Sequence, residues 1–568
     1  MLHFIDFEVF TQDWLCVIIS PTHKTKEVIV NDREKLKAYH HRYKNEIFVG
    51  YNIRRYDQYI FKSILIGFDP KDVNDWIIVK DLRGFDYSDL FMSKEAKLNS
   101  YDAMPGQVGL KKLEAFMGNS IEESDVDFTL NRKLTTYEVA QTINYCTHDV
   151  EQTMLVFCHR KSHFDAVLGL INLFKLPLNY LGKTDAQLTA QILGAINRTY
   201  NDEWNIRLPE NVLLGKYEAV GAWFLSPENQ REKAMLNIDI AGVQHDFGWG
   251  GVHGAVKNYI YECAADEIML MVDVDQLYPT LMTLYKLLSR SITRPERFAS
   301  ILKTSLDLKA KGETKKREPY KLICNVVSGA SGDENNPMYD PLHRNLVCVF
   351  GMVFMVDLID KIDSFCELIQ SNTDGILLKL KRADLPKLDA AITEWEQRTH
   401  LHMSRKEYKK VIQKDVNNYI VIAANGSYKG KGIVVKAQNP LDYDCPIINE
   451  ATLNYFIHGI PPEKTIRSCN ELIKFQQICH VSRNFDYGLH GLNRLKERTN
   501  RVFASKDLSD GGVFKVKIGQ NPIKFADTSL NCFIDNGDVK NKTVPEKLDR
   551  DFYINLVQRK IDKFLGKE

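Results

Sequence analysis

The sequence predicts a multidomain protein of mixed α/β and α+β class. Its 568 residues suggest three to four domains, at roughly 150 residues per domain. Strand and helix patterns alternate over residues 1 to about 100, which is typical of an α/β domain. Residues 281–365 have mostly helical patterns and precede an apolar hairpin, which is typical of an α+β arrangement.

The composition excludes several classes of protein. Hydrophobic residues make up 44% of the chain, yet no apolar run approaches the ~20 residues that a membrane span needs. The 11 cysteines are scattered without a Cys-x-x-Cys pair, which favours reduced thiols in a cytoplasmic protein and argues against structural zinc. The start of the chain reads as a strand rather than a signal peptide. The net charge is only +1, so a nucleic-acid partner requires basic residues gathered on one surface.

The expected elements follow from apolar periodicity and turn residues. The expected helix covers residues 135–157, and a further helix is expected at the end of the chain. Strands are expected at residues 2–10, 14–19, 47–50, 76–79, 268–274, 365–369, 376–380, 416–423 and 432–435.

Two carboxylates in the first strand are the first candidate site residues. Alternate residues of a strand share a face, so Asp6 and Glu8 point together while Ile5, Phe7 and Val9 point into a core. An isolated Asp-x-Glu on a strand is more often part of a solvated face, and the interpretation therefore depends on what accompanies it.

Two further acids accompany this pair. Asp57 ends the segment Asn-Ile-Arg-Arg-Tyr-Asp, and Asp149 lies four residues after Tyr145 in the expected helix, on the same helical face. Thr135 and Glu138 have the spacing of a capping box at the start of that helix. Such a group of carboxylates can hold two divalent cations.

These segments resemble the three motifs of the DnaQ-like 3′–5′ exonuclease domains, which are Asp-x-Glu, Asn-x-x-x-(Phe/Tyr)-Asp and Tyr-x-x-x-Asp, in the same order. The resemblance implies a domain of RNase H-like fold over residues 1–180. It assigns metal binding to four residues, namely Asp6, Glu8, Asp57 and Asp149. It implies that Tyr145 assists cleavage by orienting the attacking water. It also implies that Asn52 and Tyr56 contact the frayed 3′ end of a DNA strand.

A second pair of carboxylates lies far downstream. Asp273 ends a buried apolar strand, and Asp374 lies in the turn of the expected hairpin, which lets it approach that strand. Nucleotidyl transfer requires at least two carboxylates that bridge two Mg²⁺ ions. Tyr278 follows Asp273 closely and can lie under the sugar of a nucleotide, where it would exclude a 2′-hydroxyl.

A basic stretch between these two acids can neutralise a triphosphate. Lys309, Arg317 and Lys321 have spacings of eight and four, which place them on roughly one face of a continuous helix. Gly312 and Pro319 argue that the segment is not one helix throughout. Taken alone, the charge run is more typical of a solvated basic loop.

The three segments together resemble motifs A, B and C of the family B DNA polymerases. Motif A runs from Asp273 to Pro279, with Gln276 where the family has Ser. Motif C is Asn-Thr-Asp-Gly, with Asn372 in place of the first Asp while the indispensable second acid is kept as Asp374.

Motif B keeps three residues of the family pattern Lys-x-x-x-Asn-Ser-x-Tyr-Gly. They are Lys321, Asn325 and Gly329, and the resemblance assigns Tyr278, Lys309, Arg317, Lys321 and Asn325 to the deoxynucleoside triphosphate. Val326 and Ser328 depart from the pattern, and the missing Tyr at Ser328 puts packing against the nascent base pair in doubt.

Two more segments fit the same family and imply contacts with DNA. Trp249, Gly250 and Gly251 resemble a Tyr-x-Gly-Gly region that touches template. Lys414 and Tyr419 resemble the Lys-x-Tyr motif that holds the primer end, with the Lys displaced. Lys429 and Lys431 follow in a hairpin and suit the phosphates of duplex DNA.

The resemblance implies a right-hand polymerase after the exonuclease domain. The palm would cover residues 181–282 and 346–440, the fingers 283–345, and the thumb and C-terminal region 441–568. It is closest to compact phage-encoded enzymes, because only 48 positions separate Asp273 from Lys321 and leave little room for priming insertions. The implied cofactors are two Mg²⁺ ions at each site, with Mn²⁺ as a substitute. The implied partners are primer–template DNA and deoxynucleotides.

Two alternatives remain open at this point. The departures at Gln276, Asn372, Val326 and Ser328 also fit an exonuclease with a degenerate polymerase domain that serves in DNA binding or repair. The final helix contains the spacing of a sliding-clamp peptide, at Gln558, Ile561, Phe564 and Leu565, but a closing amphipathic helix explains the same residues. We otherwise expect a monomer.

Overall fold

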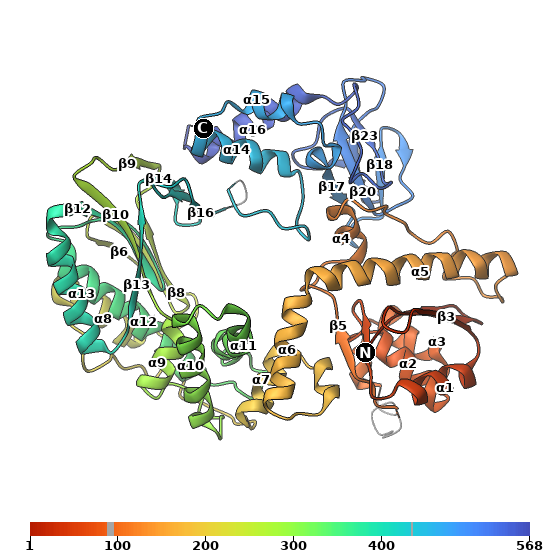
Figure 1. Cartoon of the computed structure of the whole chain (residues 1–568), viewed down its shortest axis with the longest axis horizontal. Helices are drawn as coiled ribbons and strands as arrows, with labels where there is room; N and C mark the ends of the chain where they lie inside the picture. The colour runs from red at the N-terminus through yellow and green to blue at the C-terminus, as the bar shows by residue number, and fades with distance from the viewer. Residues whose placement is uncertain (88–95, 433–434, 568) are drawn as a thin grey trace. The chain divides into compact units, whose positions relative to one another are not determined.

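The computed structural model describes residues 1–87, 96–432 and 435–567, and all ranges below refer to this part of the chain. The described chain divides into two compact units, whose elements are labelled in Figure 1. Unit 1 contains Met1–Thr184, Gln438–Glu450 and Glu463–Leu556. Unit 2 contains Asp185–Ala437, Ala451–Pro462 and Val557–Glu568. The domain boundaries expected from the sequence stay predictions.

Unit 1 is built on a five-stranded mixed sheet with the strand order β3-β2-β1-β4-β5. Its strands are β1 (Leu2–Val9), β2 (Trp14–Ser20), β3 (Thr25–Val30), β4 (Ile47–Gly50) and β5 (Ser100–Asp102). The central strand β1 is antiparallel to β2 and parallel to β4. The predicted strands at residues 2–10, 14–19 and 47–50 are therefore confirmed.

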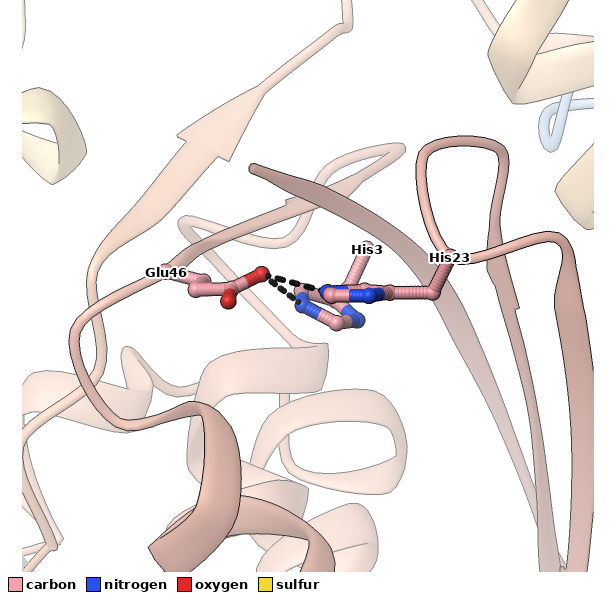
Figure 2. A group of neighbouring side chains, drawn as sticks. All are labelled: His3, His23 and Glu46. Atoms are coloured by element: carbon pink, nitrogen blue, oxygen red, sulfur yellow. Dashed lines mark hydrogen bonds and ion pairs between the residues drawn. The ribbon is translucent and has the colours of Figure 1, made fainter.

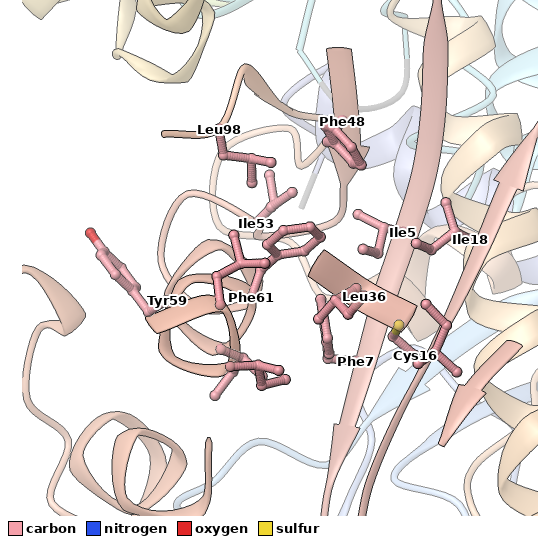
Figure 3. Packing of buried hydrophobic residues seen from close by; sticks show 14 of the residues in the cluster. Ile5, Phe7, Cys16, Ile18, Leu36, Phe48, Ile53, Tyr59, Phe61 and Leu98 are labelled. Atoms are coloured by element: carbon pink, nitrogen blue, oxygen red, sulfur yellow. The ribbon is translucent and has the colours of Figure 1, made fainter. Parts of the chain in front are cut away.

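Helices cover both faces of this sheet. They are α1 (Arg33–Tyr43), α2 (Asp57–Ile66), α3 (Pro70–Asn74), α4 (Leu110–Phe116), α5 (Thr136–His159) and α6 (Lys161–Leu173). On one face, Ile5 and Phe7 of β1 pack with Leu36 of α1 and Phe61 of α2, as Figure 3 shows. Helix α5 packs on β1 and β2, where Phe4 meets Phe157. The predicted capping box of Thr135 and Glu138 starts α5.

One predicted strand of this region is wrong. Residues 76–79 belong to a π-helical turn, η1 (Asp75–Val79), which directly continues α3. The apolar, β-branched composition favours a strand, but β5 already pairs with β4 at that edge of the sheet. The side chains of Ile78 and Val79 are consequently left exposed.

The C-terminal part of unit 1 contains two small sheets with the orders β17-β20-β23 and β19-β18-β21-β22. Their strands are β17 (Gln477–His480), β18 (Tyr487–His490), β19 (Asn493–Arg494), β20 (Thr499–Ala504), β21 (Val513–Val516), β22 (Ile523–Lys524) and β23 (Cys532–Ile534). The helices α14 (Pro446–His458), α15 (Pro462–Ser468) and α16 (Arg550–Phe564) flank them in sequence. In α16, Ile561 and Phe564 are buried, which favours the closing amphipathic helix over a clamp peptide.

A fully buried arginine ties these small sheets to α4. The guanidinium of Arg501, on β20, is 0% exposed, and burial lowers its pKa to about 10. Its donors reach oxygen atoms of Gln476, Asp535, Gly537, Ala115 and Asn119, of which all but the Gln476 amide are backbone carbonyls. Each of these acceptors is a neutral oxygen, so the charge is stabilised mainly by oriented dipoles, with a smaller contribution from the charges of Asp535 and Asp538.

Unit 2 contains a seven-stranded sheet with the order β13-β10-β12-β11-β8-β7-β6 and a four-stranded sheet with the order β16-β15-β14-β9. The strands of the first are β6 (Met235–Ile240), β7 (Val243–Gly248), β8 (Gly251–Ala255), β10 (Glu267–Val274), β11 (Glu367–Asn372), β12 (Gly375–Lys381) and β13 (Met403–Tyr408). Those of the second are β9 (Tyr259–Glu262), β14 (Lys410–Asp415), β15 (Asn418–Ile422) and β16 (Tyr428–Lys431). The predicted hairpin thus forms, whereas the strand expected at 432–435 lies partly outside the described residues.

The two sheets enclose an apolar core. Met269 and Met271 of β10 pack with Val411 of β14 and Val421 of β15. Because side chains alternate along β10, Asp273 continues the same face just beyond this core. A long buried helix, α12 (Pro341–Ile362), packs with α9, α13 and β8.

The remaining helices of unit 2 are α7 (Asp185–Leu193), α8 (Glu218–Leu225), α9 (Leu277–Leu284), α10 (Pro295–Ala310), α11 (Thr314–Ala330) and α13 (Leu385–Thr399). Helices α10 and α11 pack on each other. The chain breaks between them around Gly312, as predicted, while Pro319 is accommodated inside α11. Among the described residues, no helix is both long and apolar enough to cross a membrane. All eleven cysteines are described, and none of them is in a disulfide.

Replacing Arg501 by Met tests the buried guanidinium. The change leaves several buried carbonyls without donors, so we expect the free energy of unfolding to fall by about 3 kcal/mol or more. The midpoint of thermal unfolding measures it. The exposed Arg483→Met is the matched control and should change stability by less than about 0.5 kcal/mol. Equal midpoints for the two variants would contradict this role.

Candidate active sites

The first candidate site forms on the face of β1 that α5 covers. Asp6 and Glu8 point to this face, opposite to Ile5 and Phe7, as the strand alternation predicts. The thiol of Cys146 in α5 lies 3.8 Å from a carboxylate oxygen of Asp6. The neighbouring helix therefore closes over the two acids.

Asp57 joins these acids from the first turn of α2. Its side chain is 2% exposed, and its Oδ1 atom has no hydrogen-bond partner in the described chain. Burial, followed by the charge of Asp6, raises the pKa of Asp57 well above its usual range. A buried carboxylate oxygen without a donor has room for a cation as its partner.

Helix α5 contributes Tyr145 and Asp149, four residues apart on one face. The pKa of Asp149 is raised by burial, against which Lys111 acts. Burial, then the charge of Asp149, also raises the pKa of Tyr145, which keeps the phenol protonated. The structure therefore brings Asp6, Glu8, Asp57, Asp149 and Tyr145 together within unit 1.

Lys111 on α4 is the residue that the sequence analysis missed here. Its Nζ forms ion pairs with Asp149 and, at 3.1 Å, with the fully buried Glu114, and it lies 4.7 Å from the ring centre of Tyr145. Burial lowers the pKa of Lys111, but the charges of Asp149 and Glu114 outweigh it and raise the pKa overall. The Leu-Lys-Lys-Leu-Glu sequence of α4 resembles an ordinary amphipathic helix, which is why the sequence alone did not flag Lys111.

The charge balance of this site favours divalent cations. Burial, and to a lesser extent the charge of Asp149, raises the pKa of Asp6 to about 7. The pKa of Glu8 is raised well above its usual range by burial and by Asp6, Asp149 and Asp57. One lysine does not neutralise four crowded acids, so the residues present fit bound Mg²⁺.

Asn52 and Tyr56 lie in the loop that leads into α2. Asn52 has a left-handed backbone with φ of 58°, and its backbone N–H donates to a carboxylate oxygen of Asp102. The hydroxyl of Tyr56 donates to Asn74 at 2.7 Å. Their contact with a nucleic-acid end stays a prediction.

The second candidate site forms where β10 meets β12. Asp273 pairs with Gly375 in the antiparallel register, which brings the adjacent Asp374 beside it. The backbone oxygen of Asp374 accepts from the Val274 amide at 2.8 Å. Burial raises the pKa of Asp273. The charge of Lys429 opposes this effect, and the charge of Asp374 adds to it. Asp374 itself is exposed.

Both acids line a cavity of about 690 Å³ in unit 2. Its lining includes five cations, namely Lys309, Arg317, Lys406, Lys429 and Lys431. The carboxylates in the lining are Asp273, Asp275 and Asp374. The excess of cations over carboxylates suits a ligand with several phosphates next to a metal-binding pair.

Helices α10 and α11 contribute the basic side of this cavity. Lys309 of α10 forms an ion pair with Asp275, and Arg317 of α11 bonds the Ser305 hydroxyl at 3.3 Å. Lys321 and Asn325 follow Arg317 at intervals of four along α11, on the same face, but they are not in the cavity lining. Lys321 pairs with Glu318 at 3.9 Å.

The turn after β10 directs the polypeptide into α9. Gln276 has a left-handed backbone with φ of 47° and donates to Ser305 at 3.2 Å. Tyr278 packs against α12, where an added Cβ at Gly351 would lie 3.4 Å from its ring. Burial raises the pKa of Tyr278, followed by Cys348, so the phenol stays neutral. Tyr278 is not in the cavity lining.

In the segment from Trp249 to Gly251, which is expected to contact DNA, the tryptophan side chain is buried. The Trp249 side chain is 3% exposed, packs with Trp204, Trp223 and Phe224, and donates to the Asn229 carbonyl. Its indole is therefore part of the core, and nucleic-acid contact by this side chain is not available. Gly250 is exposed. Gly251 has a φ of 155°, and a Cβ atom added there would lie only 2.7 Å from the Thr373 hydroxyl, so a larger residue would not fit.

The predicted primer-holding residues separate in the structure. Tyr419 lines the cavity and is 3% exposed, and Lys429 and Lys431 line it from β16. Lys414 is not in the lining, whereas Lys406 is, and it lies opposite Met271 in the register of β13 with β10. Lys406 stands two residues before Tyr408, so a Lys-x-Tyr spacing could have found it.

His253 and Asn372 add a neutral polar edge to the cavity. Burial lowers the pKa of His253, and the charge of Lys431 adds to this, while a hydrogen bond to Asn372 opposes it. Asn372, which stands where motif C has its first acid, thus has His253 as a hydrogen-bond partner. The sequence predicts a structural role for His253, packed beside the neighbouring glycines, whereas the structure places it in the cavity lining.

No family model matches the chain, and no curated protein matches it. Among solved structures, the chain is similar to a family B DNA polymerase from the hyperthermophilic archaeon Pyrobaculum calidifontis, with 13% identity and a TM-score of 0.42. The match covers 100% of this chain and 78% of that one. A likeness at this level does not assign a function, which has to come from the sites.

Substituting Gly375 by Ala tests the geometry of the second site. An added Cβ would lie 2.1 Å from Oδ1 of Asp273 and 2.8 Å from the Val272 carbonyl, so the carboxylate must move. In an Asp6→Ala, Glu8→Ala background, we expect Mn²⁺ affinity to fall by about tenfold or more, which is about 1.4 kcal/mol. Titration calorimetry measures it. The matched control is Gly109→Ala, where nothing lies within 4 Å of the added Cβ; equal affinity in both variants would count against the site.

Proposed function

We propose that this chain is a template-directed DNA polymerase that extends a 3′-hydroxyl primer with deoxynucleoside triphosphates and carries a 3′–5′ proofreading exonuclease. The observation that carries the proposal is the meeting of Asp273 and Asp374 at paired strands, in a cavity lined by five cationic side chains. The order of motifs A, B and C along the sequence supports the same activity.

The residues of the cavity have distinct tasks in this proposal. Bound Mg²⁺, held by Asp273 and Asp374, would supply charge neutralisation at the reacting phosphate. Lys309 lies on α10 and Arg317 on α11, and both line the cavity, where their charges suit the triphosphate. Lys406, Lys429 and Lys431 lie on β13 and β16, where they suit the backbone of the primer–template duplex. Tyr278 would support the sugar from α9.

Unit 1 supports the exonuclease part of the proposal. The sheet order β3-β2-β1-β4-β5, with β1 at the centre and β2 antiparallel to the other four strands, fits the expected RNase H-like domain. Asp6, Glu8, Asp57 and Asp149 would hold two Mg²⁺ ions that stabilise charge during phosphodiester cleavage. Tyr145, kept neutral by burial, would orient the attacking water as a hydrogen-bonding group.

A second candidate is an exonuclease whose polymerase unit only binds DNA. The observation that favours it is Asn372, which stands where the family has an acid and is engaged with His253. The retention of both Asp273 and Asp374 in one cavity favours synthesis instead. A role in replicating a phage or other mobile genome follows from the compactness of motifs A to B and is part of the proposal.

The two activities can be separated by two substitutions. Asp374→Ala should lower primer extension by at least about a hundredfold and leave degradation of single-stranded DNA intact. Asp57→Ala should do the reverse. Gel assays of a labelled primer–template, with Mg²⁺ and with or without deoxynucleotides, measure both.

A carboxylate outside the cavity serves as the matched control. Asp266 precedes β10 at the end far from Asp273 and pairs with Lys381, and Asp266→Ala should leave both activities unchanged. Retained extension in Asp374→Ala defeats the polymerase assignment. A wild-type protein that shortens primers and never lengthens them selects the second candidate.

A further inference from the structure

Three side chains with metal-ligating atoms meet at one end of the sheet of unit 1 (Figure 2). His3 lies near the start of β1, His23 in the turn between β2 and β3, and Glu46 directly before β4. Asp6 and Glu8 lie further along β1, so this cluster is separate from the first candidate active site.

The distances within the cluster fit a single ion. Oε2 of Glu46 lies 2.7 Å from Nε2 of His3 and 3.1 Å from Nε2 of His23, and the three ligand atoms all lie within 4.8 Å of one another. Ligands about 2.0 Å from a tetrahedral zinc ion are about 3.3 Å apart. Only small side-chain shifts separate the cluster from that geometry.

A tyrosine orients the buried imidazole. Nδ1 of His3 lies 2.7 Å from the hydroxyl of Tyr39, so Nε2 faces Glu46. Metal-binding histidines commonly use the second ring nitrogen in this way, because the hydrogen bond fixes both tautomer and ring orientation. The ring of His3 also stacks on Phe48, which restricts its rotation.

The cluster is accessible from solvent. The side chain of His3 is 0% exposed, whereas His23 is 26% and Glu46 16% exposed, which leaves a route from solvent.

We propose that His3, His23 and Glu46 bind one zinc ion, with water completing its coordination. Two imidazoles and one carboxylate form a donor set that zinc accepts, whereas Mg²⁺ prefers oxygen ligands. The scattered cysteines argue against cysteine-bound zinc and leave this donor set untouched. The ion would join the start of β1, the β2–β3 turn and the start of β4, and so fix the strand that carries Asp6 and Glu8.

Metal titration of the full chain in excess Mg²⁺ tests the proposal, because Mg²⁺ then occupies the carboxylate sites. Zn²⁺ is added in competition with a chromogenic chelator, and Co²⁺ is added separately to record its visible absorption. We expect one Zn²⁺ per chain and the intense absorption of low-coordinate Co²⁺. His23→Gln should lower Zn²⁺ affinity by at least about a hundredfold, because it removes a direct ligand.

The matched control is His159→Gln, an exposed histidine at the end of α5, which should bind Zn²⁺ as the unmodified chain does. Glu46→Gln is the second test variant and should lose the Co²⁺ absorption while circular dichroism shows an unchanged fold. Equal Zn²⁺ affinity in His23→Gln and His159→Gln, or no Zn²⁺ retained against the chelator, would show that the cluster is only hydrogen-bonded. Neither outcome depends on polymerase or exonuclease activity.

Discussion

Crowding of carboxylates is the physical constraint on which both candidate active sites depend. Like charges placed together in a partly buried site cost free energy unless cations neutralise them. In unit 1 the cost is visible in the raised pKa values of Asp6, Glu8 and Asp57. The fold imposes this crowding, because β1, α2 and α5 carry these acids to one place.

The same constraint explains how strand pairing and distant contacts serve the sites. In unit 2, β10 is held between β12 and β13, so the position of Asp273 is fixed on both sides. In unit 1, Lys111 reaches Asp149 from α4, and α4 is held in turn by the hydrogen bonds of Arg501. The position of the Lys111 ammonium next to the acids of the first candidate site thus depends on Arg501, a residue far along the chain.

Much of the site could be predicted because strand alternation and motif order are local. Alternation placed Asp6 and Glu8 opposite Ile5 and Phe7, and the hairpin turn placed Asp374 beside Asp273. Lys111 was missed because its role arises from helix packing that no local pattern encodes, whereas the local Lys-x-Tyr spacing to Tyr408 could have identified Lys406. Residues 76–79 were predicted wrongly, since their apolar composition favours a strand whose place beside β4 is taken by β5. Trp249 was assigned from a motif, whereas its burial depends on three aromatic partners distant in sequence.

The central claim is that Asp273 and Asp374 share a metal ion during synthesis. Anomalous diffraction from a crystal containing primer–template DNA, an incoming deoxynucleotide and Mn²⁺ tests it most directly. The account predicts an Mn²⁺ peak bonded to both carboxylates and to the triphosphate, with Arg317 or Lys309 on its other side. Mn²⁺ bound to one of the two carboxylates alone, or outside their cavity, in a crystal that still extends the primer would contradict it.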